Sequence, residues 1–166
     1  MNTLTESQLR DAFVNASKGE AKRAMIPDLD QVDFSRLDYF GWQDAKKPRH
    51  HYVALELDGE VAVLLLRGPD NPPAKKMLCA WCEDIVDGVH AASFVAPLAG
   101  ASGRRGNTVG TAICADFRCS RNVRREPSSF EVRSEDPALL AYHREQKIAG
   151  LQERSTAFVR TVIERS

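Results

Sequence analysis

The stretch Cys79-Ala80-Trp81-Cys82, together with the later pair Cys114 and Cys119, decides how this chain folds. These are the only cysteines among its 166 residues. A two-residue spacer lets both sulfurs of a tight turn point at one ion, and a four-residue spacer is also usual in structural zinc sites. Four thiolates fill the coordination sphere of zinc and leave no position for water. The spacing predicts one structural Zn²⁺ held by Cys79, Cys82, Cys114 and Cys119.

Free thiols, disulfides and a thiol-based redox sensor are the alternatives for these cysteines. Residues 1–9 are polar and do not resemble a signal peptide, so disulfides of a secreted protein are not expected. A thioredoxin-like motif would be followed by a long helix, whereas residues 83–88 read as a polar turn. His90 follows Cys82 by eight residues and is the alternative ligand if one cysteine does not bind.

Bulk composition is that of an ordinary globular protein, with 43% hydrophobic residues and a formal net charge of zero. We expect one domain over residues 1–166, in the cytoplasm. The longest apolar run, residues 61–66, is too short to cross a bilayer, so no membrane partner is expected. Basic charge gathers around the second cysteine pair, because residues 100–133 hold seven arginines against three acidic residues.

The N-terminal third predicts one helix and an aromatic cluster. Thr5 and Gln8 have capping-box spacing, and Ser17-Lys18-Gly19 reads as the end of that helix. Residues 20–34 look like a connector. Four large rings follow, which predict core packing beneath a loop, with an exposed aromatic platform as the alternative: Phe34, Tyr39, Phe40 and Trp42.

Four strands are expected, in two hairpins. Asp58-Gly59 joins residues 51–57 to residues 60–67 and is a strong signal of a two-residue turn. Residues 61–66 are nearly all apolar, which indicates a central strand covered on both faces. Residues 92–98 and 108–113 form the second hairpin, between the cysteine pairs, around a flexible loop over 99–107. Residues 128–133 are a candidate for one more strand.

A short helix over 118–125 begins at the second cysteine pair. A treble-clef zinc finger consists of a knuckle, here the turn with Cys79 and Cys82, followed by a hairpin and a closing cysteine pair at the start of a helix. We expect this arrangement over residues 77–125. From Pro137 to the end the pattern is helical, with one apolar stripe facing the sheet and a bend or break allowed at Gly150. The predicted fold is α+β: a mostly antiparallel sheet around the treble clef, with an N-terminal helix and a long C-terminal helix.

No catalytic motif stands out, so we expect a protein that is not an enzyme and has no small-molecule substrate. Gly103, Gly106 and Gly110 match neither a P-loop nor a dinucleotide loop. Arginine forks suit carboxylates and phosphates, so the basic side chains are either a solvated surface or a contact surface for an acidic protein or RNA. The candidate partner-binding residues are Arg104, Arg105, Arg118, Arg121, Arg124 and Arg125.

Five segments spread over nearly the whole chain resemble one known family. They are Phe13-Val14-Asn15-Ala16-Ser17-Lys18-Gly19-Glu20-Ala21, Phe40-Gly41-Trp42, Cys79-Ala80-Trp81-Cys82, Phe94-Val95-Ala96-Pro97, and Gly106-Asn107-Thr108-Val109-Gly110-Thr111 running on to Ile113-Cys114-Ala115-Asp116. This pattern resembles the FBP-domain proteins, relatives of the C-terminal treble-clef zinc-finger domain of elongation factor G-binding proteins. The fusidic-acid resistance proteins FusB and FusC belong to the same group.

The resemblance implies a role beyond zinc binding. Members of the resistance branch bind elongation factor G through this domain and help release it from the ribosome when fusidic acid traps it there. The family's zinc ligands correspond to Cys79, Cys82, Cys114 and Cys119. This chain differs in having one predicted helix near Thr5 where that branch has a helical bundle. The resemblance therefore implies binding of elongation factor G, with an RNA- or ribosome-binding zinc module as the alternative function.

Overall fold

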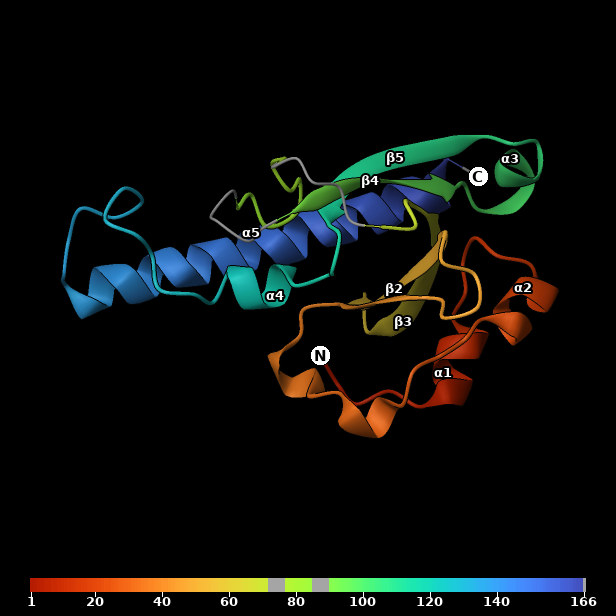
Figure 1. Ribbon diagram of the computed structural model, residues 1–166, viewed down its shortest axis with the longest axis horizontal. Helices are drawn as coiled ribbons and strands as arrows, with labels where there is room; N and C mark the ends of the chain where they lie inside the picture. The colour runs from red at the N-terminus through yellow and green to blue at the C-terminus, as the bar shows by residue number, and fades with distance from the viewer. Residues whose placement is uncertain (72–76, 85–89, 166) are drawn as a thin grey trace.

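A computed structural model describes residues 1–71, 77–84 and 90–165 (Figure 1). Its centre is a five-stranded antiparallel sheet in chain order. The strands are β1 (Phe40–Gln43), β2 (His50–Leu57), β3 (Glu60–Arg67), β4 (Ala91–Pro97) and β5 (Thr108–Cys114). The helices are α1 (Glu6–Asp11), α2 (Lys18–Arg23), α3 (Gly100–Arg104), α4 (Cys119–Asn122) and α5 (Pro137–Glu164), with 3-10 turns η1 (Leu29–Gln31) and η2 (Phe34–Arg36). The predicted α+β class is confirmed.

Both predicted hairpins form. In the first, Asp58 (φ 53°) and Gly59 (φ 86°) take the left-handed backbone that a tight two-residue turn needs, and Leu57 pairs with Glu60. In the second, β4 and β5 pair from Ala91 opposite Cys114 to Pro97 opposite Thr108. The open end of the second hairpin therefore lies beside Cys114, and its turn end, at Pro97 and Thr108, lies away from the cysteines.

Strand β3 is covered on both faces, as its apolar sequence predicts. Val63 and Leu65 face a cluster that contains Phe40 and Trp42. Leu64 and Leu66 alternate with them and face a second cluster, which contains all four cysteines, Trp81 and the buried hydrophobic residues of α5. The N-terminal segment covers the first face, while the zinc-ligand segments and α5 cover the second.

The aromatic segment is core, and the exposed-platform alternative is wrong. Phe34, Tyr39, Phe40 and Trp42 keep 7% or less of their surface exposed. Phe40 stacks on Trp42 with 4.9 Å between ring centroids. The expected loop is a strand instead, because β1 pairs with β2, with Phe40 opposite Ala54.

The single N-terminal helix predicted from Thr5 to Gly19 is wrong. Helix α1 has the predicted Thr5–Gln8 capping box but ends at Asp11. The chain then pairs with β3, where the Val14 N–H donates to the Val63 carbonyl (3.0 Å) and the Val63 N–H donates to the Ala12 carbonyl (2.9 Å). Ser17 begins the next helix, since its side chain caps α2 in a second capping box with Glu20.

Asn15 joins the two hairpins where they separate. Strands β3 and β4 share one paired position, Arg67 opposite Val95. Beside it, the Asn15 amide donates to the carbonyls of Leu65 (3.0 Å) and Pro97 (2.9 Å), and its oxygen accepts from the Leu65 N–H (2.8 Å). One side chain thus supplies the hydrogen bonds that a neighbouring strand would otherwise make.

Three other local predictions are corrected. The loop over 99–107 contains helix α3, whose Gly103 lies so close to the Leu98 carbonyl that a Cβ would sit 1.8 Å from it. The helix predicted over 118–125 is the shorter α4. Residues 128–133 are turn and irregular chain rather than a strand. The polar turn predicted over 83–88 lies mostly outside the described residues.

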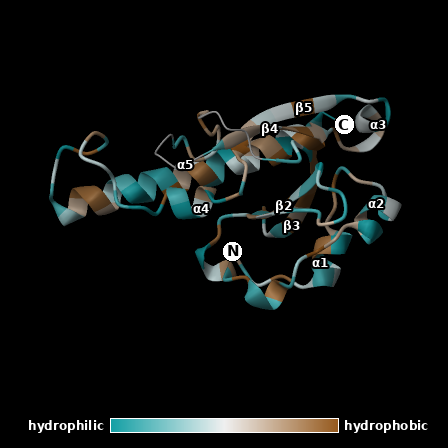
Figure 2. Ribbon diagram, viewed as in Figure 1, coloured by the Kyte–Doolittle hydropathy of each residue, from teal (hydrophilic) through white to brown (hydrophobic). Residues whose placement is uncertain are grey.

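Helix α5 is unbroken at Gly150 and has two unlike halves (Figure 1). Its buried residues begin at Leu151 and continue with Ser155, Val159 and Val162. Figure 2 shows hydrophobic residues concentrated where α5 runs beside β4 and β5, next to a hydrophilic stretch. Within the described ranges, no helix is long and apolar enough to cross a membrane.

Candidate metal centre

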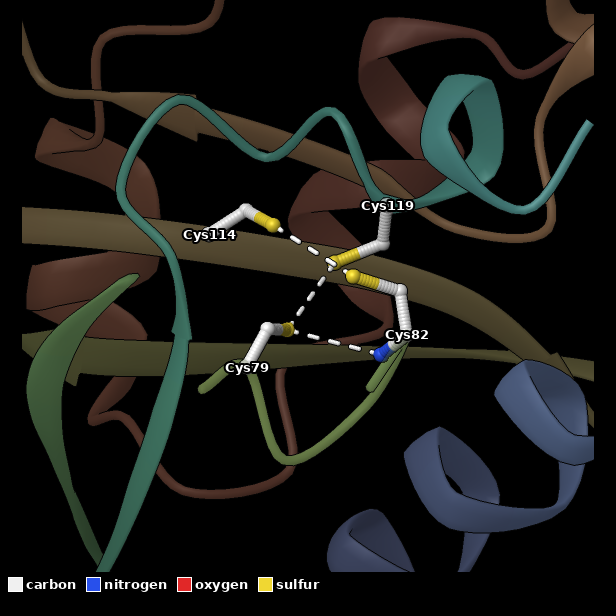
Figure 3. A group of neighbouring side chains, drawn as sticks. All are labelled: Cys79, Cys82, Cys114 and Cys119. Atoms are coloured by element: carbon white, nitrogen blue, oxygen red, sulfur yellow. Dashed lines mark hydrogen bonds between the residues drawn. The ribbon is translucent and has the colours of Figure 1, made fainter. Parts of the chain in front are cut away.

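Two separate turns carry the four cysteines to one place (Figure 3). Cys79 and Cys82 lie on the turn that precedes β4, and it closes with the Glu83 N–H donating to the Cys79 carbonyl (2.9 Å). Cys114 is the last residue of β5 and Cys119 the first of α4. Between them Phe117, with φ 57°, donates its N–H to the Cys114 carbonyl (3.0 Å). Both turns therefore fold back so that their sulfurs face each other.

The sulfur positions fit one tetrahedral zinc ion. Cys79 Sγ lies 3.6 Å from Cys119 Sγ, and Cys82 Sγ lies 3.6 Å from Cys114 Sγ. All four sulfurs lie within 4.8 Å of one another and all four residues are buried. Zinc–sulfur bonds of about 2.3 Å give a tetrahedron with edges of about 3.8 Å, which matches these separations. Bound there, Zn²⁺ would tie the two turns together with no coordination position left for water.

The other uses of the cysteines fit this geometry less well. Sulfurs 3.6 Å apart are not bonded to one another. His90 is outside the group of metal-ligating side chains, so the alternative set with a histidine is not the one that the described residues form. Four clustered thiols also affect each other's protonation. Hydrogen bonding among the sulfurs, with Cys114 first, lowers the pKa of Cys79, whereas hydrogen bonding to Cys119 raises the pKa of Cys114. All four become thiolates together only when a cation balances them.

Two polar side chains that the spacing rules did not single out lie beside the sulfurs, and one of them is hydrogen-bonded to a sulfur. Asn122 donates its amide N–H to Cys114 Sγ (3.4 Å). The Tyr39 hydroxyl is buried and has no hydrogen-bond partner among the described residues. Burial, and after it the nearby Cys119, raises the pKa of Tyr39, so this hydroxyl keeps its proton and can donate a hydrogen bond to a thiolate. Nothing in the sequence pattern separates Tyr39 from its aromatic neighbours.

The knuckle is anchored on α5. Trp81, between the first two ligands, is 2% exposed and packs edge-to-face on Tyr39 with centroids 5.0 Å apart. Arg154 on α5 donates its Nε–H to the Trp81 carbonyl (2.8 Å). The same arginine forms a 3.2 Å ion pair with Glu83. The first half of the site is therefore held against the C-terminal helix.

The six candidate arginines fall into two groups at opposite ends of β5. Arg104 and Arg105 lie at the end of α3, beside the Pro97–Thr108 end of the hairpin. The other four lie around α4, which follows the Cys114 end of β5 (Figure 1): Arg118 is the N-cap of α4, Arg121 is in it, and Arg124 and Arg125 follow it. Seven strand residues at about 3.3 Å each separate the groups by roughly 20 Å, so they do not form one continuous surface.

Two of the four arginines near α4 are bound within the molecule. Arg124 forms a two-pronged ion pair with Asp38, whose side chain is 2% exposed. Arg125 donates to Asp84 (2.8 Å) and to Glu131 (2.8 Å). Hydrogen bonds from Arg125 lower the pKa of Glu131 to about 2. Arg124 and Arg125 therefore hold the zinc-binding segment to its surroundings.

Arg118 and Arg121, the other two arginines near α4, differ in whether the side chain has a partner within the molecule. Arg118 is exposed but forms a 3.1 Å ion pair with Asp116. Arg121 is exposed, and its side chain makes no hydrogen bond or ion pair within the described part of the chain. Of this group, Arg121 is the one whose guanidinium group is directed at solvent without an internal partner.

A knuckle, a β-hairpin and a short helix around four clustered sulfurs define a treble-clef zinc-finger protein. The sequence comparisons agree: residues 8–162 match the model of the family "FBP C-terminal treble-clef zinc-finger", and the chain belongs to that family. None of the curated proteins matches the sequence significantly. Among solved structures, the fold is similar to that of the fusidic acid resistance protein FusC, with a TM-score of 0.55 and 21% sequence identity. The similarity covers 74% of this chain and 52% of FusC, so the chain spans about half of that protein.

Proposed function

We propose that this protein is not an enzyme but a zinc-organised binding protein for translation elongation factor G, and that binding helps release the factor from the ribosome. Membership of the FBP zinc-finger family supports this proposal, because the family resemblance implies binding of that factor. The similarity to a fusidic acid resistance protein agrees with it.

The convergence of the four sulfurs is the observation that carries the proposal. Four thiolates saturate zinc, so the ion has a structural role. Helix α4 begins at a ligand, Cys119, and β5 ends at another, Cys114. Zinc binding therefore fixes the surface around α4 before a partner arrives, which lowers the ordering cost of binding.

The partner surface that we propose includes the exposed arginines rather than all six candidates equally. Arg124 and Arg125 support the surface through their ion pairs with Asp38, Asp84 and Glu131. Arg118 and Arg121, near the zinc site, and Arg104 and Arg105, at the far end of β5, remain available for contact with a partner.

Binding to RNA or to the ribosome itself is the second candidate. The arginines between residues 100 and 133 favour it, since guanidinium groups bind phosphates as well as carboxylates. The salt dependence of the binding affinity distinguishes the two functions. Binding through several phosphates weakens steeply as salt rises, and a shape-matched protein interface weakens less.

Titration calorimetry of the zinc-loaded protein with purified bacterial elongation factor G tests the proposal. We expect a one-to-one complex that is lost on chelation and in the variant Cys114→Ser. Loss is expected because a structural zinc site without one ligand loses most of its metal affinity and the folding free energy that depends on it. Ser93→Ala, an exposed change on β4, is the control that should bind normally. Binding to ribosomal RNA but not to the factor would overturn the proposal in favour of the second candidate.

A further inference from the structure

An open groove of about 620 Å³ lies between the η1–η2 segment and the end of α4. One wall carries Val32 and Leu37, which are partly buried, and the exposed side chains Gln31, Asp33 and Arg36. The other wall carries Arg121 and the ion-paired arginines that follow it. The groove therefore has two partly buried apolar side chains, and four arginines outnumber the one acidic side chain, Asp33, around them.

The two walls are fastened to each other through Asp38. Its backbone N–H donates to the Ser120 hydroxyl (2.9 Å), and its carboxylate is paired with Arg124. Gln152 on α5 donates its amide to the same carboxylate (2.9 Å). Ser120 directly follows the zinc ligand Cys119. The spacing of the walls is thus set by hydrogen bonds at Asp38, one of which joins it to the residue next to a zinc ligand, and the groove exists before anything enters it.

Arg36 and Arg121 are the charged groups that the groove can offer to a ligand. Each is exposed, and neither side chain makes a hydrogen bond or ion pair within the described ranges. The other guanidinium groups of the groove already donate to internal carboxylates. A ligand that supplies a carboxylate gains a charge-assisted hydrogen bond from each unpaired arginine without breaking an existing one.

The chemistry of the rim favours an acidic protein segment over RNA. Asp28 and Asp30 are exposed on the chain that leads to this wall, and Asp33 lies on the wall itself. They would repel a continuous phosphate backbone, whereas a protein segment can place one or two acidic side chains opposite the arginines and an apolar side chain on Val32 and Leu37. We propose that this groove receives an acidic segment of the protein partner, with Arg36 and Arg121 as its charged contacts. This inference rests on the proposed function and assigns it a place on the molecule.

A pair of double charge reversals tests the inference by calorimetry with bacterial elongation factor G. Arg36→Glu with Arg121→Glu changes the groove, and Lys18→Glu with Lys22→Glu makes the same charge change at two exposed positions of α2 that do not line the groove. We expect the groove variant to bind at least roughly tenfold more weakly and the α2 variant to stay within about twofold of the unaltered protein. Zinc content and circular dichroism should be unchanged in both.

Each outcome decides one proposal. Equal losses in both variants, or a larger loss in the α2 variant, overturn the groove while leaving factor binding intact. If the unaltered protein does not bind the factor, the proposed function fails instead. A groove variant that loses binding to ribosomal RNA, with binding of the factor unchanged, shows that phosphates use these arginines. The single variant Arg36→Glu lies outside the zinc-binding segment and must also weaken binding, which rules out damage to α4 as the cause.

Discussion

At the scale of single residues, the environment of the sulfurs is set by side chains far away in the sequence. Tyr39 comes from the chain before β1, and Asn122 comes from α4. Asn122 donates to the sulfur of Cys114, and the Tyr39 hydroxyl lies near Cys119 with its proton free to form a hydrogen bond to a thiolate. Donors of this kind orient ligands and strengthen metal binding, and their loss typically costs 10–100-fold in affinity.

Tyr39→Phe tests this role with little change in shape. The ring keeps its packing against Trp81, while the hydroxyl is lost. We expect zinc to be transferred to a chromophoric chelator about tenfold faster than from the unaltered protein. Tyr142→Phe removes an equivalent hydroxyl from an exposed ring and should leave the transfer rate unchanged. Equal rates for all three proteins would show that the buried hydroxyl does not act on the sulfurs.

At the scale of elements, the two hairpins depend on a few backbone contacts. The β2–β3 hairpin is paired along its full length, whereas β3 and β4 share one paired position. The segment after α1 and the Asn15 side chain satisfy the backbone of β3 where β4 does not. The N-terminal segment is therefore part of the sheet rather than a separate cap on it.

Asn15→Ala should destabilise the fold because three backbone groups lose their partner. The groups are the Leu65 N–H and the carbonyls of Leu65 and Pro97. An unsatisfied buried group costs about 1–3 kcal/mol, and water replaces part of the loss, so we expect about 2–4 kcal/mol from urea unfolding. Asn2→Ala removes an exposed hydrogen bond to Glu56 and should cost about 0.5 kcal/mol or less. A similar small cost for both variants would contradict the joining role of Asn15.

The elements differ in how well the sequence predicts them. The second hairpin and the metal ligands follow from local rules, since Cys-x-x-Cys spacing has meaning without any tertiary context. Asp58-Gly59 predicts its turn for the same reason. The end of α1 was predicted wrongly because the residues after Asp11 have helical periodicity, yet pairing with Val63 removes them from the helix. Tyr39 and Arg36 could not be recognised as parts of a site, because only the folded chain brings them to the zinc and the groove.

At the scale of the whole molecule, ion pairs join the zinc-binding segment to the rest of the chain. Arg125 connects the segment after α4 to Asp84 beside the knuckle and to Glu131 before α5. Arg124 connects it to Asp38 at the other side. These contacts link parts of the chain that the metal itself does not touch.

Glu131→Gln reveals the pH dependence of this linkage. The pKa of Glu131 lies at about 2 in the folded protein, below its ordinary value of 4.5. A lowered pKa means that the carboxylate stabilises the folded state fully above pH 4.5, and that this contribution is lost as pH falls from 4.5 towards 2. We expect the unaltered protein to be more resistant to urea than the variant at pH 6, with the difference shrinking between pH 4.5 and pH 3. Acid release of zinc affects both proteins, so the difference between them isolates the carboxylate. A constant difference across this range would contradict the linkage.

The split of the metal ligands between two turns has a consequence during synthesis. Cys79 and Cys119, whose sulfurs meet at 3.6 Å, are separated by 40 positions in the chain. A growing polypeptide exposes Cys79 and Cys82 as a weak two-sulfur chelate while the other two ligands have yet to be translated. Zinc coordination is completed only when the intervening loop closes. The free energy of binding zinc through four sulfurs offsets the entropy that the chain loses on closing this loop. Stable zinc binding is therefore possible only after Cys119 has been synthesised, and a chain truncated before that residue binds zinc weakly.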